Sequence, residues 1–218
     1  MERISKFADF TYSENSEKYI SDMVKYLDEN AYSILKFFGV SSDETNITIN
    51  VFDDLDEFRK HIKETRKKYG KEKDTEEWLC GFTAGNHIDI INYDLFKDMK
   101  NESFEDYKKM LVHEFVHAVH FTSKDENYKK DAGSKWINEG LAIYFSKQMD
   151  SNITFDKNVT KEILRNGDTN YKNYFLAFLK VLNSTDINFI RDISTKYDFY
   201  LENEDNALNL VFNNKVMK

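Results

Sequence analysis

Proline is absent from this chain of 218 residues, and only 7 residues are glycine. These two shortages exclude collagen-like repeats, proline-rich linkers and glycine/serine tethers. Cys80 is the single cysteine, so neither an intramolecular disulfide bond nor a zinc knuckle built from several cysteines can form. The chain therefore has to fold around a hydrophobic core, for which its 40% hydrophobic residues are sufficient.

Basic charge and long apolar runs are also scarce. The 39 acidic residues outnumber the 31 lysines and arginines, which gives a net charge of −8, so we expect no binding to nucleic acid. No window approaches 18 consecutive apolar residues, and the N-terminal segment lacks a basic stretch followed by an apolar one. We therefore expect no membrane span, no secretory signal and a cytoplasmic location. We also expect a monomer.

Hydrophobic periodicity places strands in the first half of the chain. Apolar residues alternate strictly over residues 46–52, which predicts a half-buried strand. Two apolar runs flank the turn Gly85-Asn86 within residues 78–93, which predicts a hairpin. A long helix is predicted before these strands, over residues 17–38.

Helices dominate the rest of the chain. Cap signals predict one helix from Asp54 to near Gly70 and a second from about residue 104 to residue 121. After a polar loop, further helices are expected over residues 135–148, 159–165, 171–182, 186–197 and 204–213. Strands followed by helices indicate an α+β fold rather than alternating βαβ units. We expect a single domain over 1–218, with an N-terminal lobe (1–122) and a helical C-terminal lobe (123–218).

The segment with the clearest chemistry is HEFVH, at residues 113–117 on a predicted helix. Residues four apart on a helix lie about 40° apart, so the imidazoles of His113 and His117 project from one face. Two nitrogen ligands placed in this way can chelate one Zn²⁺, while Glu114 can reach a metal-bound water without binding the metal. The alternative interpretation is a pair of core histidines on a buried helix face.

A catalytic zinc requires a third protein ligand, for which the residues leave several candidates. His120 lies near the same helix face but higher on the helix, and its simpler role is packing. His87 on the hairpin and His61, which we expect to be solvated, are weaker candidates. Glu139 interrupts an apolar run, and a carboxylate there is costly unless it is paired, for example with Lys135, or bound to a metal.

The two motifs together resemble the gluzincin zinc peptidases. HEFVH is followed, 22 positions after His117 (139 − 117), by the Glu139 of the segment NEGLA. The resemblance is strongest to the compact peptidase-MA-like domains and more remote to thermolysin and the M1 aminopeptidases, and it covers about residues 46–182. It implies a zincin-like fold: a small mixed sheet packed on helices, an all-helical C-terminal lobe and an active-site cleft between them. It also implies one catalytic domain, with the strand at 87–93 as the sheet edge that binds an extended peptide.

The resemblance further implies a role for each motif residue. His113, His117 and Glu139 would be the ligands of a Zn²⁺ cofactor, and Glu114 would be the general base in the hydrolysis of a peptide or protein substrate. Cys80 is not required as a nucleophile.

Members of the family also carry a downstream tyrosine or histidine that stabilises the oxyanion. No histidine follows His120. Tyr171 is the best match to this position, and Tyr174 is the second choice. A structural role remains the alternative for either tyrosine.

Two departures from the family pattern bear on function. Ile143 stands where thermolysin has an acidic residue, so the support of the histidine ligands has to come from elsewhere. The Gly-x-Met-Glu-Asn string of the aminopeptidases is absent, which favours an endopeptidase. An aminopeptidase of the same fold and a catalytically inactive binding module are the two alternatives.

Overall fold

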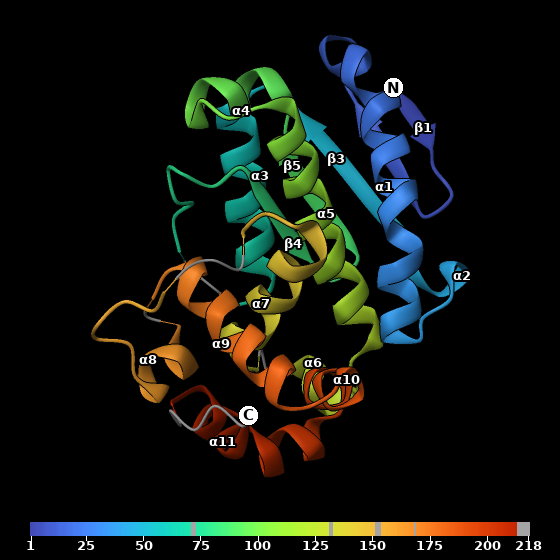
Figure 1. Ribbon diagram of the computed structural model, residues 1–218. Coiled ribbons are helices and arrows are strands. Elements are labelled where there is room, and N and C mark those ends of the chain that lie inside the picture. The colour runs from blue at the N-terminus through green and yellow to red at the C-terminus, as the bar shows by residue number, and fades with distance from the viewer. Residues whose placement is uncertain (71–72, 131–132, 151–153, 168, 213–218) are drawn as a thin grey trace. The chain divides into compact units, whose positions relative to one another are not determined.

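A five-stranded mixed sheet occupies the first half of the chain, and helices make up the second half (Figure 1). The α+β class expected from the sequence is therefore confirmed. The structure is a computed structural model that describes residues 1–70, 73–130, 133–150, 154–167 and 169–212. The chain divides into two compact units, Met1–Thr122 and Ser123–Lys218. The predicted cleft and the single catalytic domain stay predictions.

The sheet has the strand order β1-β2-β3-β5-β4. The three inner strands run parallel to one another: β2 (Ala8–Tyr12), β3 (Ile47–Phe52) and β5 (His87–Ile91). The two outer strands, β1 (Glu2–Ile4) and β4 (Gly81–Ala84), are antiparallel to their neighbours. The predicted hairpin is β4 and β5, but its edge strand is β4. Our prediction that residues 87–93 form the edge is wrong, because β5 is paired on both sides and cannot add another strand.

The two faces of the sheet differ in polarity. On β3, Ile47, Ile49 and Val51 are buried on one face, as the alternation predicts. The opposite face of β3 carries Thr48 and Asn50, which pair in register with His87 and Asp89 of β5. The apolar face therefore builds the core, whereas the other face carries a row of polar side chains.

The helices of the N-terminal unit lie along both faces of this sheet. Helix α3 contacts β3 and β5 on the polar face. On the other side, α1 and α5 lie together, since the Lys108 ammonium sits 4.7 Å from the centre of the Tyr26 ring (Figure 1). The helices of this unit are α1 (Glu17–Phe38), α2 (Ser42–Thr45), α3 (Leu55–Lys68), α4 (Tyr93–Lys100) and α5 (Phe104–Ser123).

Helix α5 begins at a reciprocal cap. The Ser103 amide donates to the Asp106 carboxylate over 3.3 Å, and the Asp106 amide donates back to the Ser103 hydroxyl over 3.2 Å. This exchange satisfies amide groups that the first turn of a helix leaves without partners. The remainder of α5 is buried on most sides, so its position is fixed by packing along its length.

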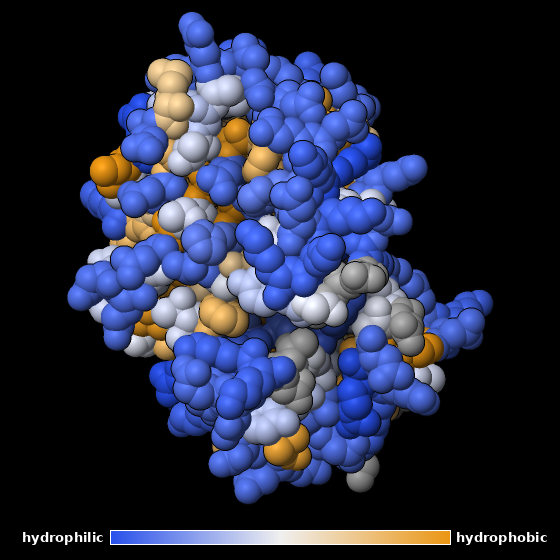
Figure 2. Space-filling view, turned by 180° about the vertical axis from the view of Figure 1, so that it is seen from behind, coloured by the Kyte–Doolittle hydropathy of each residue, from blue (hydrophilic) through white to orange (hydrophobic). Residues whose placement is uncertain are grey.

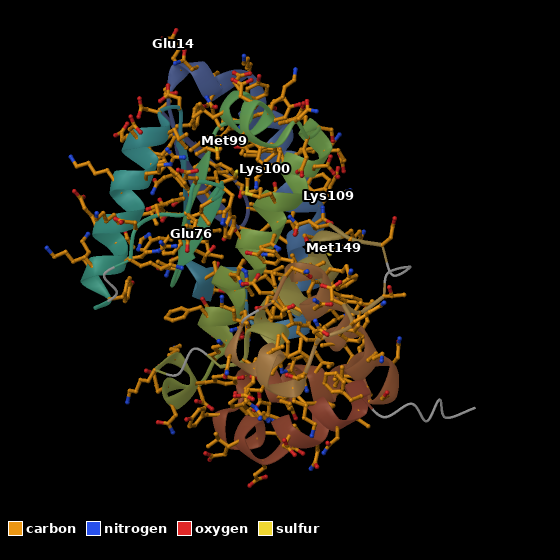
Figure 3. All side chains as sticks on the ribbon, turned by 90° about the vertical axis from the view of Figure 1, so that its left-hand side faces the viewer. Glu14, Glu76, Met99, Lys100, Lys109 and Met149 are labelled. Carbon is orange, nitrogen blue, oxygen red and sulfur yellow. The ribbon has the colours of Figure 1, made fainter. Side chains whose placement is uncertain are left out.

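Arg66 of α3 contacts both β4 and the loop before it, through an ion pair and a cation–π contact. Glu76, which is labelled in Figure 3, lies in the loop that leads into the strand. Arg66 of α3 pairs with it over 2.7 Å. The Arg66 guanidinium also lies 5.4 Å from the centre of the Phe82 ring, on β4 itself. The Arg66 side chain is only 12% exposed, so this pair is screened less than an ordinary surface ion pair.

The C-terminal unit contains only helices among its described residues. Its centre is the packing of α7 against α9, where a Cβ added to Gly140 would lie 2.4 Å from the Phe178 Cβ. Only glycine allows the two helices to approach so closely. The helices are α6 (Glu126–Lys130), α7 (Lys135–Ser146), α8 (Lys161–Asn166), α9 (Tyr171–Ser184), α10 (Ile187–Thr195) and α11 (Tyr197–Phe212).

Several elements differ from the sequence-based expectations. The short strands β1 and β2 were not predicted, although β2 alternates between buried and exposed positions. Residue 93 was placed in the hairpin but begins α4, because the Asn92 side chain caps this helix by accepting from the Leu95 amide. The polar loop expected at 122–134 includes the short helix α6, and α11 begins at Tyr197 rather than at 204.

The surface is mostly charged and polar. Figure 2 shows a face that is largely hydrophilic, with hydrophobic side chains exposed in small groups. No helix among the described residues is long and apolar enough to cross a lipid bilayer.

Candidate metal centre

Helix α5 presents two imidazoles side by side. The Nε2 atoms of His113 and His117 lie 3.1 Å apart, and the ring planes are inclined at 79°. Two nitrogens bound to one tetrahedral zinc at about 2.05 Å each would lie about 3.3 Å apart. The spacing on the helix therefore needs almost no adjustment to chelate one metal ion.

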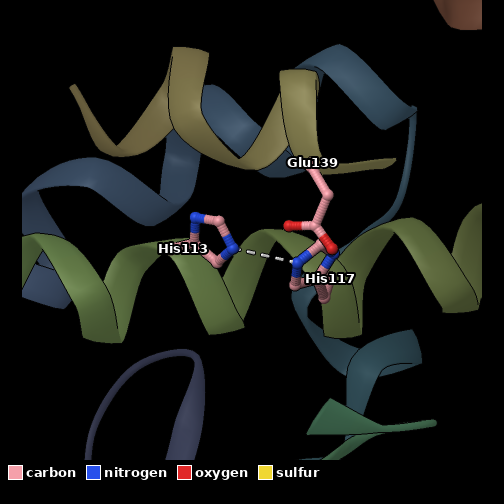
Figure 4. Close-up of side chains that lie close together, drawn as sticks. All are labelled: His113, His117 and Glu139. Carbon is pink, nitrogen blue, oxygen red and sulfur yellow. Dashed lines mark hydrogen bonds between the residues drawn. The ribbon is translucent and has the colours of Figure 1, made fainter. Parts of the chain in front are cut away.

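Glu139 of α7 completes a group of three ligand residues. His113, His117 and Glu139 each offer one ligand atom, and these atoms lie within 4.8 Å of one another (Figure 4). Within the C-terminal unit, Glu139 follows two fully buried residues, Trp136 and Ile137. Two imidazole nitrogens and one carboxylate oxygen form a donor set that can hold a metal ion.

Glu114 lies outside this group of ligands and is held by β4. Its side chain is 9% exposed, and its Oε2 accepts a hydrogen bond of 2.6 Å from the Thr83 hydroxyl. A Cβ added to Gly81 on the same strand would lie 2.9 Å from Glu114 Oε1. The carboxylate of the residue that follows His113 is therefore held by β4, a feature that nothing in the sequence of the hairpin indicates.

His120 does not belong to the ligand group. It is 2% exposed, and its ring stacks on Phe38 at the end of α1, with ring centres 5.1 Å apart and planes 19° apart. The structure thus places His120 in the packing between α1 and α5, which agrees with the simpler of the two interpretations.

The remaining two histidines lie on the polar face of the sheet. His61 Nε2 is 3.4 Å from Asp89 Oδ2, and the Asn50 amide donates to Asp89 Oδ1 over 2.8 Å. His87 Nδ1 is 2.6 Å from the Thr48 hydroxyl. Our expectation of a solvated His61 is therefore only partly right, because its ring is half exposed but its Nε2 is turned to a buried carboxylate.

This polar row lines a cavity of about 510 Å³, bordered by Asn50, His61, Asp89 and the end of α3. Burial raises the pKa of Asp89, and the opposing contributions of Asn50 and His61 are smaller. Sequence reasoning missed the cavity, although its signal was present: polar residues alternate with isoleucines on two strands.

Tyr171 is the first residue of α9 and follows the capping residue Asn170, whose side chain accepts from the Asn173 amide. It is 38% exposed, whereas Tyr174 is buried. The proposed role of Tyr171 in stabilising the oxyanion stays a prediction.

Cys80 is buried at the start of the hairpin. Desolvation raises the pKa of its thiol to about 11, so the thiol stays protonated at neutral pH. A thiolate nucleophile at this position is thereby disfavoured, as the sequence-based interpretation expects.

Comparison of the chain with protein-family models, with curated proteins and with solved structures gives no match.

Proposed function

We propose that this protein is a zinc-dependent peptidase that hydrolyses internal peptide bonds. The observation that carries the proposal is the meeting of ligand atoms from His113, His117 and Glu139 within 4.8 Å. Glu114 follows His113 directly on the same helix. When bound, zinc would supply a water of lowered pKa and polarise the scissile carbonyl group.

The chemistry of the ligand residues supports zinc over other common ions. Magnesium and calcium prefer sites built from oxygen ligands, whereas two imidazoles suit zinc and its neighbours in the transition series. Three protein ligands also leave one coordination position for a water or a substrate, which is the arrangement of catalytic rather than structural zinc sites.

The chain's own residues would then carry the proton and the developing charge. Glu114 would accept a proton from the attacking water and deliver it to the leaving amine. Tyr171 would donate its hydroxyl to the oxyanion, an interaction worth about 3–4 kcal/mol where such donors have been removed. Strand β4, one of the two edge strands of the sheet, is the strand to which an extended substrate would add.

The test combines metal content with two kinds of substrate. We expect the purified chain to hold about one zinc ion and to cleave peptides that are blocked at both ends. The control is the double variant His113→Ala/His117→Ala, which should fold but hold no zinc. A zinc-loaded chain that cleaves no peptide would overturn the proposal in favour of a binding module. Cleavage restricted to substrates with a free amine would instead identify an aminopeptidase.

A further inference from the structure

One face of β4 meets α5 at the residue proposed as the general base. Gly81 and Thr83 pair with Ile90 and Ile88 of β5, and so they lie on the apolar face of the sheet. On this face, the Thr83 hydroxyl lies 2.6 Å from Glu114 Oε2 and 3.1 Å from the Glu114 carbonyl oxygen. A hydroxyl donates a single proton, and the shorter distance assigns it to the carboxylate.

The distance indicates a strong contact. Hydrogen bonds from a hydroxyl to an ionised carboxylate fall at about 2.5–2.7 Å and are roughly twice as strong as neutral ones. Glu114 is 9% exposed, so water can provide little alternative solvation. The Thr83 hydroxyl therefore fixes the Glu114 side chain in the folded protein. Without this bond, the side chain would lose its rotamer freedom only when substrate binds.

Gly81 provides the space into which the carboxylate fits. A Cβ at this position would lie 2.9 Å from Glu114 Cγ and 2.8 Å from Met110 Sδ, both closer than a Cβ contact allows. The glycine therefore makes room for two side chains of α5, Met110 and Glu114. Gly81 and Thr83 thus both affect the Glu114 carboxylate: Gly81 leaves space for it, and Thr83 donates a hydrogen bond to it.

We propose that Thr83 is a positioning residue for Glu114: its hydroxyl holds Oε2 and so fixes the orientation of the carboxylate that would take the proton from the attacking water. The inference rests on the proposed function and adds a residue that the HEFVH motif does not contain. Because the arrangement exists before any substrate binds, its contribution belongs to the chemical step rather than to substrate binding.

The test compares Thr83→Val, which removes the hydroxyl, with Thr83→Ser, which keeps it. We expect Thr83→Val to lower kcat about 10–100-fold at unchanged KM and zinc content, and Thr83→Ser to restore kcat to within about threefold of the parent. The matched control is Thr48→Val, which removes a threonine hydroxyl from the polar face of the same sheet and should leave kcat unchanged.

Two further measurements distinguish positioning from a purely structural role. In a Glu114→Gln background, Thr83→Val should lower the residual rate no further, since the base that it positions is gone. In the metal-free proteins, the shifts in urea midpoint caused by Thr83→Val and Glu114→Gln should fail to add in the double variant. Additive shifts, or equal rate losses in both backgrounds, would overturn the inference.

The failure of this inference is distinguishable from that of the proposed function. A parent protein that binds zinc but cleaves no peptide overturns the peptidase proposal, while the urea midpoints still decide whether Thr83 and Glu114 are coupled. An active parent with Thr83→Val at parental kcat overturns only the role of Thr83.

Discussion

The two units use a glycine in the same way and for different ends. In the N-terminal unit, Gly81 lets β4 approach α5 at Glu114, a residue proposed to act on substrate. In the C-terminal unit, Gly140 lets α7 approach α9 at Phe178, which is fully buried and apolar. The first close approach shapes a polar site, and the second closes a core. The position of a glycine near a sequence motif therefore does not reveal what the glycine does. Its role follows from the side chain that packs against it.

The largest effect is expected in the N-terminal unit, from Glu114→Gln. Glutamine keeps the shape of the side chain but is no base, so kcat should fall about a thousandfold while zinc is retained. Steady-state rates and metal analysis on the same sample measure both quantities. Loss of zinc from the folded variant would show that Glu114 is a zinc ligand and would contradict its assignment as the general base.

For the C-terminal unit, the strongest effect should come from Glu139→Ala. Removal of one of three ligands should weaken zinc binding at least a hundredfold, because second-layer partners of ligands already contribute about 10–100-fold. The control is His120→Ala, which removes the imidazole that stacks on Phe38 and should leave the affinity unchanged. Titration of both variants against a zinc chelator measures their zinc affinities. Equal affinities would mean that the third ligand is a residue other than Glu139.

Tyr171→Phe tests whether the C-terminal unit also contributes to the transition state. The ring and its packing are kept, so kcat should fall about a hundredfold while KM and zinc content stay close to parental values. Tyr174→Phe and Tyr144→Phe serve as controls. If one of these is slow and Tyr171→Phe is not, the donor is a different tyrosine of the same unit.

The difference between the two glycines predicts a change in stability rather than in activity for Gly140→Ala. The added methyl would lie 2.4 Å from the Phe178 Cβ, closer than van der Waals contact allows, and overpacking of this kind costs about 1–3 kcal/mol of the free energy of unfolding. Urea unfolding measures the loss, and activity per folded, zinc-loaded molecule should stay near the parental value. A urea midpoint equal to that of the parent would mean that α9 shifts to accommodate the methyl group without loss of stability.

The smallest effect concerns two carboxylates with opposite pKa shifts. Burial raises the pKa of Asp89 in the N-terminal unit, whereas hydrogen bonds from Lys172, Asn173 and Asn170 lower the pKa of Asp156 in the C-terminal unit to about 2. Stability from Asp89 is present at low pH and is lost as the pH rises through its raised pKa. Stability from Asp156 is present above its ordinary pKa of 3.8 and is lost as the pH falls towards 2.

The variants Asp89→Asn and Asp156→Asn separate these contributions from those of the other acids. Relative to the parent, Asp89→Asn should become more stable with rising pH, and the deficit of Asp156→Asn should shrink with falling pH. Urea unfolding between about pH 2 and pH 7 measures both differences. Differences that do not vary with pH would contradict the assignments.

The sequence was sufficient for the elements that carry strong periodicity. The alternation over 46–52 and the cap at Ser103 led directly to β3 and α5, and residues 113–117 indicated two imidazoles on one helix face. The hairpin of β4 and β5 was predicted, but the order of the other strands could not be read, because the pairing of β3 with β2 and with β5 joins segments distant in sequence. For the same reason the contact of Thr83 could not be predicted: its partner Glu114 lies 31 positions later in the chain.

The two outer strands of the sheet also differ in their tendency to self-associate. β1 has three residues, two of them the charged Glu2 and Arg3, and such short charged edges resist pairing with another chain. β4 carries Gly81, Phe82, Thr83 and Ala84, none of which is charged. An uncharged edge is open to any extended segment, including β4 of a second molecule, so the strand proposed to receive substrate is also the part of this unit at which aggregation would begin.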